Sequence, residues 1–468
     1  MGWTMYFEQF YLGCLAHASY LLASEGEAVV VDPQRDVELY LKAAAEQGAT
    51  VRHIFETHLH ADFVSGHREL AARTGAKIYM GAQSGATFEH IPVSDGFELK
   101  FGKASIRVLE TPGHTPESIC LVVTDAEKST APWAVLTGDT LFIGDVGRPD
   151  LSPRHTPAQL AGLLYDSLHT KLMTLPNSVL VYPAHGAGSL CGKNMRAERS
   201  STIGTERLTN YALQIKSREE FIRQLTSNLP ARPEYFAKDA EINRTGAAAL
   251  SELPPLRSLS PTDLERMLKA GEIALDVRPM DEFAAGHVPG SVNIALGGQF
   301  ASWAATVLGL TSHPVLIAET DAQVEEARIR LARVGIEALD GYLAGGVAAW
   351  KQSGLPLATV TQISPQELER RLSAGKVKVL DVRREPEWDA GHVEGAAWWP
   401  LDNFRVSPPE IDHEVPLAVH CKGGYRSMIA ASLLQRAGFR NVLNVIGGFD
   451  AWQQANLPFV TAVTASAK

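Results

Sequence analysis

Residues 57–63 of the chain are Thr57-His58-Leu59-His60-Ala61-Asp62-Phe63, and this stretch decides the fold of the first half of the chain. It follows an apolar run at 51–55 that has the character of a strand, and it precedes a helical pattern that begins near His67. A loop between a strand and a helix brings the two histidines and the carboxylate close together. Imidazole and carboxylate groups are common metal ligands, so the stretch predicts a metal site at the end of a strand.

Three more polar clusters each follow a predicted strand. They are Thr111-Pro112-Gly113-His114-Thr115, Thr137-Gly138-Asp139-Thr140 and Tyr182-Pro183-Ala184-His185-Gly186. From about residue 27 to 186, short apolar runs alternate with amphipathic stretches, which is typical of an α/β domain with its reactive residues at strand ends. Four clusters in this order resemble the metallo-β-lactamase superfamily. The resemblance implies an αββα sandwich over residues 1–250.

The first cluster departs from the two-metal hydrolases of that superfamily at one position. Where those enzymes have a histidine that helps to hold a second ion, this chain has Phe63. One ion held by two histidines and one carboxylate keeps coordination positions open, which suits Fe(II) that binds both O₂ and a sulfur substrate. In both respects the chain is similar to the persulfide dioxygenases of the superfamily. The resemblance implies that His58, His114 and Asp139 hold one Fe(II), with O₂ as cosubstrate and zinc as an alternative occupant after purification.

Three residues are expected around these ligands rather than on the ion. The resemblance implies that His60 and Asp62 orient the ligands and bound water. His185 matches a second-metal ligand of the hydrolases, and its role stays open.

Two more residues are candidates for contact with the substrate. Arg148 lies in the segment 138–150, which looks like the dioxygenase segment that leads from the aspartate ligand to an arginine near the substrate. We expect it to hold a thiol carrier or a sulfur oxyanion, with a structural ion pair as an equal alternative. Cys191 lies just past His185 and near Lys193, so we expect it at the mouth of the site, where the lysine favours its thiolate and persulfide handling.

The second half of the chain repeats itself with a period of about 100 residues. Leu275-Asp276-Val277-Arg278 returns as Leu380-Asp381-Val382-Arg383, and Gly345-Gly346 returns as Gly447-Gly448. Such a period is typical of duplicated whole domains. We therefore expect two α/β modules with parallel sheets, a middle module at residues 256–357 and a last module at residues 360–460.

The last module has a cysteine in a cationic loop that contains glycine. The loop is Cys421-Lys422-Gly423-Gly424-Tyr425-Arg426, and it lies between an apolar run and a helical pattern. Its backbone N–H groups point at one place and, with the two cations, hold an anionic persulfide. The loop is similar to the rhodanese active-site loop. The resemblance implies that Cys421 and Arg426 are catalytic, and that the substrate contacts Lys422, Gly423, Gly424, Tyr425 and Arg383.

The middle module lacks this nucleophile. Aligning Pro314 with Pro416, and the two Gly-Gly pairs with each other, puts Glu319 opposite Cys421. Acidic side chains follow where the last module has cations, so an anionic donor is repelled. We expect an inactive rhodanese module that serves as a spacer or an interface.

Composition limits the partners and the compartment. The formal net charge of −10 disfavours nucleic acid, and no apolar run reaches the length of a membrane span. The N-terminal residues show no basic stretch followed by an apolar run, which favours the cytoplasm. The four scattered cysteines form no CxxC pair and are expected to be reduced.

Together the two halves predict one reaction sequence. The iron domain oxidises a low-molecular-weight persulfide to sulfite and thiol, and Cys421 then passes a second sulfane sulfur to sulfite to form thiosulfate. The thiol carrier stays open between the glutathione, coenzyme A and bacillithiol types, and we expect a homo-oligomer. The alternatives are a zinc-dependent thioesterase of the glyoxalase II type fused to a sulfurtransferase, and a carrier of sulfur without catalytic activity.

Overall fold

The structure is a computed structural model that describes residues 5–227, 229 and 232–461. The chain divides into two compact units, the first made of Met1–Leu253 with Ala332–Gly335 and the second of Pro254–Leu331 with Ile336–Lys468. Both repeated modules belong to the second unit. The prediction of a cytoplasmic protein rests partly on the N-terminal residues. Of these, residues 1–4 lie outside the described residues. Within the described ranges, no helix has the length and apolar character needed to cross a membrane.

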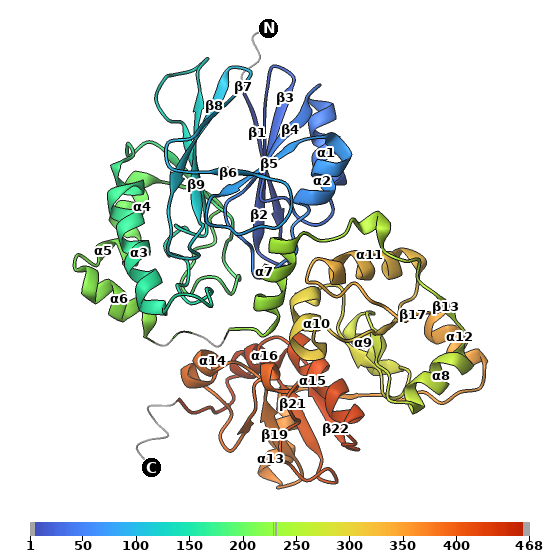
Figure 1. Ribbon diagram of the computed structural model, residues 1–468. Helices are drawn as coiled ribbons and strands as arrows, with labels where there is room; N and C mark the ends of the chain where they lie inside the picture. Colours follow the sequence, from blue (N-terminus) through green and yellow to red (C-terminus); the bar gives the residue numbers. More distant parts are fainter. Residues whose placement is uncertain (1–4, 228, 230–231, 462–468) are drawn as a thin grey trace. The chain divides into compact units, whose positions relative to one another are not determined.

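The first unit has two sheets with helices outside each of them (Figure 1). The first sheet has the order β1-β2-β3-β4-β5-β6, and the second has the order β12-β11-β10-β9-β8-β7. The strands of the first sheet are β1 (Tyr6–Leu12), β2 (His17–Ser24), β3 (Glu27–Val31), β4 (Thr50–Glu56), β5 (Lys77–Gly81) and β6 (Ile91–Val93). The strands of the second sheet are β7 (Glu98–Phe101), β8 (Ala104–Glu110), β9 (Ile119–Asp125), β10 (Ala134–Gly138), β11 (Leu180–Pro183) and β12 (Ser201–Thr202).

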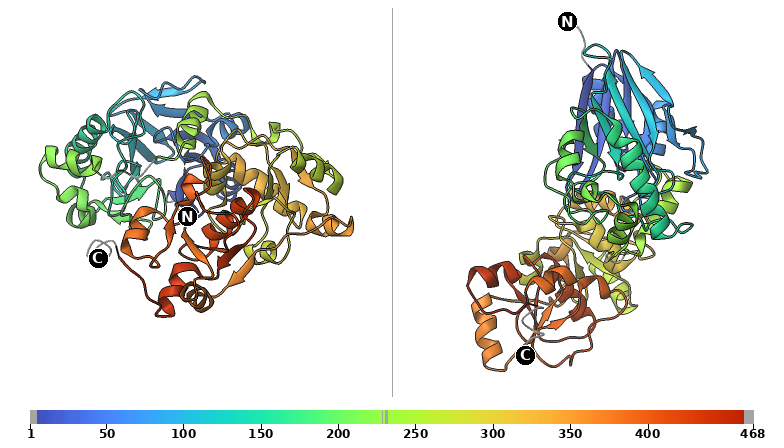
Figure 2. Two further views of the ribbon diagram at one scale, coloured as in Figure 1. Left: turned by 90° about the horizontal axis from the view of Figure 1, so that it is seen from below. Right: turned by 90° about the vertical axis from the view of Figure 1, so that its left-hand side faces the viewer.

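The helices of this unit cover the outer faces of the two sheets. In Figure 1, α1 and α2 lie beside one sheet, and α3 to α6 lie beside the other; the left view of Figure 2 again shows the green helices on one side of the strands. The helices are α1 (Glu38–Glu46), α2 (His67–Thr74), α3 (Pro157–Thr170), α4 (Ile203–Thr209), α5 (Tyr211–Gln214), α6 (Arg218–Thr226) and α7 (Tyr235–Thr245), with the short turns η1 (Leu172–Thr174) and η2 (Leu250–Glu252).

Alternation along the strands explains this layering. In β2, Tyr20 and Leu22 belong to the core between the sheets, whereas Leu21 belongs to the core under α1 and α2. In β9, Leu121 faces the central core and Val122 faces the core under α3. Successive side chains of a strand point to opposite faces, so a continuous apolar strand must be covered on both sides. The αββα sandwich expected from the sequence is confirmed.

The second unit has two five-stranded parallel sheets, one in each module, ordered β13-β17-β16-β14-β15 and β18-β22-β21-β19-β20. The elements of the middle module are β13 (Ser258–Leu259), α8 (Pro261–Lys269), β14 (Ala274–Asp276), α9 (Met280–Ala285), β15 (Val292–Asn293), α10 (Phe300–Leu308), β16 (Val315–Ile317), α11 (Asp321–Ala332), β17 (Gly341–Leu343) and α12 (Gly346–Gln352). The elements of the last module are β18 (Thr361–Ile363), α13 (Pro365–Ser373), β19 (Lys378–Asp381), α14 (Glu385–Ala390), β20 (Ala397–Trp398), η3 (Leu401–Asn403), β21 (Leu417–His420), α15 (Tyr425–Arg436), β22 (Val442–Val445) and α16 (Gly448–Gln454).

The two modules build their cores in the same way. Leu264 of α8 and Trp350 of α12 pack on one face of the middle sheet, as Leu368 of α13 and Trp452 of α16 do in the last module. The other face of the last sheet is covered by α15, which begins at the cysteine loop. The predicted pair of rhodanese-like modules with parallel sheets is confirmed.

Candidate metal centre and sulfur-transfer loop

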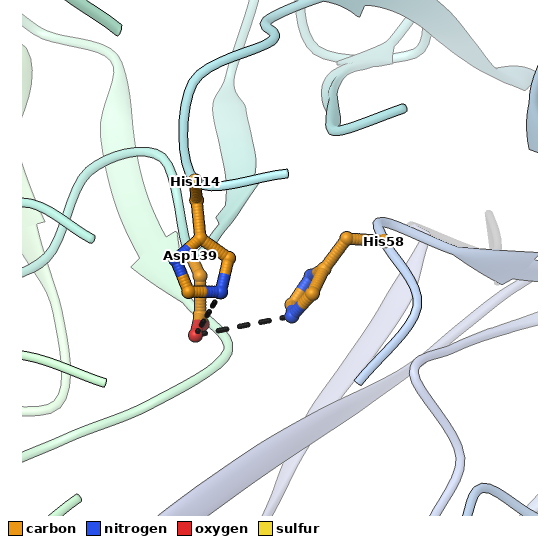
Figure 3. Close-up of side chains that lie close together, drawn as sticks. All are labelled: His58, His114 and Asp139. Atoms are coloured by element: carbon orange, nitrogen blue, oxygen red, sulfur yellow. Dashed lines mark ion pairs between the residues drawn. The ribbon is translucent and has the colours of Figure 1, made fainter. Parts of the chain in front are cut away.

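Three of the predicted metal ligands converge at the ends of strands. His58 follows β4, His114 follows β8, and Asp139 follows β10. The Nε2 atoms of His58 and His114 lie 3.8 Å and 3.4 Å from Oδ2 of Asp139 (Figure 3). All three side chains are buried, and their ligand atoms lie within 4.8 Å of one another. The arrangement can hold one metal ion.

The far nitrogen of each imidazole is occupied, which directs the near nitrogen to the site. Nδ1 of His58 lies 3.0 Å from Oγ1 of Thr57, and Nδ1 of His114 lies 2.9 Å from the carbonyl oxygen of Arg148. Thr57 in turn donates to both carboxylate oxygens of Asp32, from its backbone N–H and its hydroxyl. Partners of this kind set the ring orientation of a metal-binding histidine.

The electrostatics of the three residues suit a cation. Burial lowers the pKa of His58 and His114 below the usual histidine value, so both rings are neutral ligands at neutral pH. Burial by itself raises the pKa of the Asp139 carboxyl, but the net effect, in which the charge of His185 is the largest lowering cause, holds that pKa well below its usual value. Oδ2 of Asp139 is buried and has no hydrogen-bond partner among the residues that the structure describes. Two neutral imidazoles beside an unpartnered carboxylate oxygen fit the donor set of a mononuclear Fe(II) site.

His60 turns its Nε2 away from these ligands. That atom lies 3.2 Å from Oδ1 of Asp32 and 3.5 Å from Oε2 of Glu56, and all three side chains are buried. Burial alone would lower the pKa of His60, but the charge of Asp32 outweighs it and raises the pKa. His60 is thus tied to carboxylates beneath the site.

His185 lies between two carboxylates. Its Nδ1 is 2.8 Å from Oδ1 of Asp139, and its Nε2 is 2.9 Å from Oδ2 of Asp62. Burial would lower the pKa of His185, but the charges of Asp139 and Asp62 outweigh it and raise the pKa well above the usual value. Asp62, His185 and Cys191 form what we call the second cluster, whose ligand atoms lie within 4.8 Å of one another.

Phe63 is buried beside these groups. Its ring centroid lies 4.1 Å from that of His17 and 4.4 Å from that of His60. The aromatic ring fills space and offers no lone pair. It therefore supplies no ligand that a second ion at this position would use.

The structure contradicts the predicted exposure of Cys191 and its predicted cationic neighbour. Its side chain is only 1% exposed rather than at an open mouth, and Nζ of Lys193 donates to the carbonyl oxygen of Ser227 at 3.0 Å. Burial raises the pKa of the Cys191 thiol well above its usual value, and the carboxylates of Asp62 and Asp139 add to the effect. Burial and, after it, these carboxylates therefore favour the neutral thiol over the expected thiolate.

Arg148 forms the structural ion pair that was the alternative for this residue. Its Nε and Nη2 donate to the two oxygens of Asp150 at 2.7 Å and 2.8 Å, and Nη1 donates to the carbonyl oxygen of Leu190. The side chain is buried. Its backbone carbonyl positions His114, which is a role that the sequence did not suggest.

Asn243 belongs to the site but was not predicted from the sequence. It lies on α7, and its side-chain amide donates to the carbonyl oxygens of His60 and Phe63 at 2.8 Å and 2.7 Å. Its Oδ1 accepts the N–H of Ser65 at 2.8 Å. No local sequence signal marks this contact, whereas Asp32 at the end of β3 had the same strand-end position as the predicted ligands.

The cysteine loop of the last module has the predicted cradle. Cys421 follows β21 and is buried, and the N–H of Gly424 donates to its Sγ at 3.1 Å. Gly424 has a φ of +107°, a conformation that side chains rarely adopt. Oγ of Ser427 lies 3.7 Å from Sγ, and Lys422 and Gly423 are exposed. The structure thus shows one N–H group of the loop, that of Gly424, directed at the sulfur just before α15 begins.

The two predicted arginines of this module have different partners. Arg426 forms a bidentate ion pair with Glu387, with both contacts at 2.7 Å. Arg383 forms a bidentate pair with Asp381 and also donates to the carbonyl oxygen of Gly391 at 2.6 Å. Arg278 of the middle module makes the equivalent contacts. The guanidinium of Arg383 is buried in a pair that recurs in the middle module, and its contact with substrate stays a prediction.

The strand register corrects the predicted equivalence of Glu319. Asp276 pairs with Ile317, and the equivalent Asp381 pairs with His420, so the residue opposite Cys421 is Ala318. An added Cβ at Gly346 would lie 2.4 Å from the oxygen of Ala318, as one at Gly448 would from that of Cys421. Alignment on the prolines missed this because β21, which begins directly after Pro416, is one residue longer than β16, which begins directly after Pro314.

The loop of the middle module is also shorter and acidic. Helix α11 begins at Asp321, three residues after Ala318, whereas α15 begins four residues after Cys421. Glu319 lies beside Glu282; burial and this neighbour raise the pKa of Glu282. Ala318 offers no nucleophile, and Glu319 and Glu282 bring negative rather than positive charge to this loop. Both observations support the prediction that the middle module is inactive.

The comparisons with known proteins agree with this architecture. The metallo-beta-lactamase superfamily matches residues 12–185, and the rhodanese-like domain matches residues 260–353 and 364–455. The mitochondrial persulfide dioxygenase ETHE1 of Bos taurus is 34% identical over 212 residues, which cover 44% of this chain and 73% of that protein. The hydroxyacylglutathione hydrolase of Polaromonas sp. is 33% identical over 172 residues, which cover 36% of this chain and 61% of that protein. The crystal structure of a metallo-beta-lactamase from Staphylococcus aureus subsp. aureus COL is 32% identical, with a TM-score of 0.65, and covers 73% of this chain and 99% of that chain.

Proposed function

The chain belongs to the persulfide dioxygenase family of the metallo-β-lactamase superfamily, with two rhodanese-like domains added, and from this premise we propose that it converts thiol persulfides to thiosulfate. In the first step one persulfide, one O₂ and one water give one thiol and one sulfite. In the second step a sulfane sulfur is transferred to sulfite. The first unit performs the oxidation and the last module performs the transfer.

The proposed oxidation rests on the convergence of two neutral imidazoles and one carboxylate beside Phe63. His58, His114 and Asp139 would hold one Fe(II), which when bound supplies the activation of O₂. Thr57 and the carbonyl oxygen of Arg148 keep the two imidazoles directed at the site. The protein's own contribution to this step is therefore a rigid, buried and mononuclear donor set.

The transfer step uses the loop around Cys421. Sγ attacks the outer sulfur of a persulfide, the S–S bond breaks, and the thiol leaves with the electron pair. Sulfite then attacks the sulfur held on Cys421, thiosulfate leaves, and the cysteine returns as thiolate. The N–H of Gly424 and the N-terminus of α15 stabilise the negative charge on sulfur in both steps.

Cys191 is a second candidate for persulfide handling on the strength of its position. Its sulfur lies within 4.8 Å of ligand atoms of Asp62 and His185, and His185 contacts the ligand Asp139. Replacing Cys191 by Ser tests this role. Lower O₂ uptake with an unchanged iron content would support it, whereas unchanged O₂ uptake would mark the thiol as a packing residue.

The experiment that tests the whole proposal begins with anaerobic purification and metal quantitation. We expect about one iron per chain and O₂ uptake with glutathione, coenzyme A or bacillithiol persulfide. His114→Ala should lose iron and O₂ uptake but keep the sulfur transfer of Cys421, with His90→Ala as the control outside the site. Cys421→Ser should release sulfite without forming thiosulfate. Thiosulfate formed at the normal rate by Cys421→Ser would refute the division of labour.

A zinc-dependent thioesterase is the second candidate, because the hydroxyacylglutathione hydrolase is also similar to the chain. Phe63 disfavours it, since the ring removes a ligand for a second ion. Two zinc ions per chain, thioester hydrolysis and no O₂ uptake would establish this alternative. The cytoplasmic location and a homo-oligomer are further parts of the proposal, testable by fractionation and by light scattering.

A further inference from the structure

The middle module contacts the catalytic loop of the last module directly. We propose that its segment 295–298 positions the loop through Tyr425, so that the module without a nucleophile sets the geometry around Cys421. This inference rests on the proposed sulfur transfer by Cys421. It makes Tyr425 a positioning residue rather than a contact of the substrate, and it gives the middle module a part in the reaction.

Tyr425 is seated on the segment by a hydrogen bond and by close packing. Its hydroxyl donates to the carbonyl oxygen of Ala295 at 2.7 Å. A Cβ added at Gly298 would lie 2.5 Å from two ring atoms of Tyr425, Cε2 and Cζ. Gly298 therefore leaves the space that the ring occupies. A contact at 2.5 Å cannot be accommodated unless the ring or the segment moves.

The segment itself is held from behind, within the middle module. Arg330 of α11 donates to the carbonyl oxygen of Leu296 at 2.7 Å and to that of Gly298 at 3.1 Å. Its guanidinium also lies 5.5 Å from the ring centroid of Phe300. Two hydrogen bonds from one planar group fix the direction of the segment. The ring of Tyr425 thus rests on a support with little freedom to yield.

Helix α15 is attached to the middle module along its length as well as at its start. Oγ of Ser432 accepts the backbone N–H of Asn293, an edge residue of β15, at 3.0 Å. Gln435 lies 3.1 Å from Nε2 of His287, and Arg436 donates to the carbonyl oxygen of Gly290. These contacts hold the body of the helix. Tyr425 is the contact at the end where the sulfur is held.

The position of Tyr425 affects the thiol because Gly424 is its neighbour in the chain. The N–H of Gly424 donates to Sγ of Cys421, and Tyr425 is the first residue of α15. A shift of the Tyr425 ring is transmitted through one peptide bond to the direction of that N–H group. Misplacement of a reacting group by about 1 Å can lower a rate by about 100-fold.

Two adjacent glycines provide a matched test of the proposal. Gly297 has nothing within 4 Å of an added Cβ, whereas the Cβ of Gly298→Ala meets the Tyr425 ring. Neither glycine has a positive φ, so alanine adds only a methyl group at both positions. We expect Gly298→Ala to lower kcat for thiosulfate formation by about tenfold or more, with a smaller change in KM for sulfite. Gly297→Ala should match the unchanged protein, and O₂ uptake should be the same in both variants.

A double-mutant cycle separates positioning from general damage. Tyr425→Ala removes the ring, so Gly298→Ala should cause no further loss of kcat in that background. Tyr425→Phe keeps the ring and loses only the hydrogen bond to Ala295; we expect a smaller loss of kcat and unchanged thermal unfolding. If Gly298→Ala fails to fold, the kcat of Tyr425→Phe tests whether Tyr425 positions the loop.

The failures of the two proposals are distinguishable. No sulfur transfer by the unchanged protein would refute the proposed function. Normal transfer by the unchanged protein, with Gly298→Ala equal to Gly297→Ala and Tyr425→Phe fully active, would overturn this inference alone. Additive losses in the double variant would also overturn it, because the methyl group would then act by a route other than the ring.

Discussion

Replacing Gly424 by Ala tests whether the amide cradle drives sulfur transfer. Gly424 has a φ of +107°, and the nearest atom to an added Cβ is the nitrogen of Gly447 at 3.9 Å. The methyl group therefore has space, and the cost is conformational strain of about 1–2 kcal/mol. The loop relieves this strain by turning the peptide, which removes the hydrogen bond from the Gly424 N–H to Sγ of Cys421.

The expected loss in the rate of sulfur transfer follows from the free energy of that hydrogen bond. A hydrogen bond to a charged group contributes about 1.5–3 kcal/mol, which corresponds to a loss of roughly 10- to 150-fold in the rate of transfer. Gly438→Ala is the matched control, because Gly438 has a similar φ of +96° and an added Cβ lies 3.7 Å from the nearest atom, in the His413 ring. Both variants should lose similar stability.

Thiosulfate formation and thermal unfolding are the two assays. We expect both variants to unfold at lower temperature and only Gly424→Ala to lose sulfur transfer. O₂ uptake by the first unit should be unchanged in both. Equal rates of transfer in the two variants would contradict this explanation. Both variants carry similar strain, and only Gly424→Ala should lose the hydrogen bond to Sγ of Cys421.

Three more predictions concern the site and its supports. Phe63→His should add a histidine ligand near the three residues of the second cluster, so zinc loading should give two ions per chain instead of one, as measured by metal analysis. Arg383→Met should destabilise the second unit by about 3–5 kcal/mol in denaturant unfolding, because Asp381 is left without its cationic partner in the interior. Burial would raise the pKa of Glu387, but Arg426 outweighs it and lowers that pKa, so the pair stabilises the fold above the usual glutamate range and is lost as the pH falls through the lowered pKa. In Glu387→Gln this acid dependence should weaken, and an unchanged acid unfolding curve would exclude the pair as its source.

The candidate metal ligands could be predicted from sequence because the signal is local. His58, His114 and Asp139 each follow an apolar run, and strand ends of an α/β domain commonly carry site residues; here β4 is in the first sheet and β8 and β10 are in the second. The position of Cys421 before a helix was equally visible. The two packed sheets were expected from the family resemblance, and the structure shows that alternate residues of β2 face different cores.

The partners of charged and buried groups could not be predicted in this way. Arg148 and Arg383 looked like groups that hold substrate, yet both are occupied by carboxylates two residues away in the chain. Cys191 looked exposed beside a lysine, and the fold buries it among carboxylates. A residue type gives the chemistry that a side chain can perform, whereas its environment sets charge, burial and direction.

Neighbours in the chain were enough to predict the domain order, the candidate metal ligands and the candidate sulfur nucleophile, because periodicity and short motifs are local. The three-dimensional structure was needed to show that Ala318 is opposite Cys421, that Asn243 holds the histidine loop, and that Tyr425 packs on Gly298. These contacts join residues far apart in the chain. Their existence depends on strand register and on how side chains fill a common volume, which no local pattern encodes.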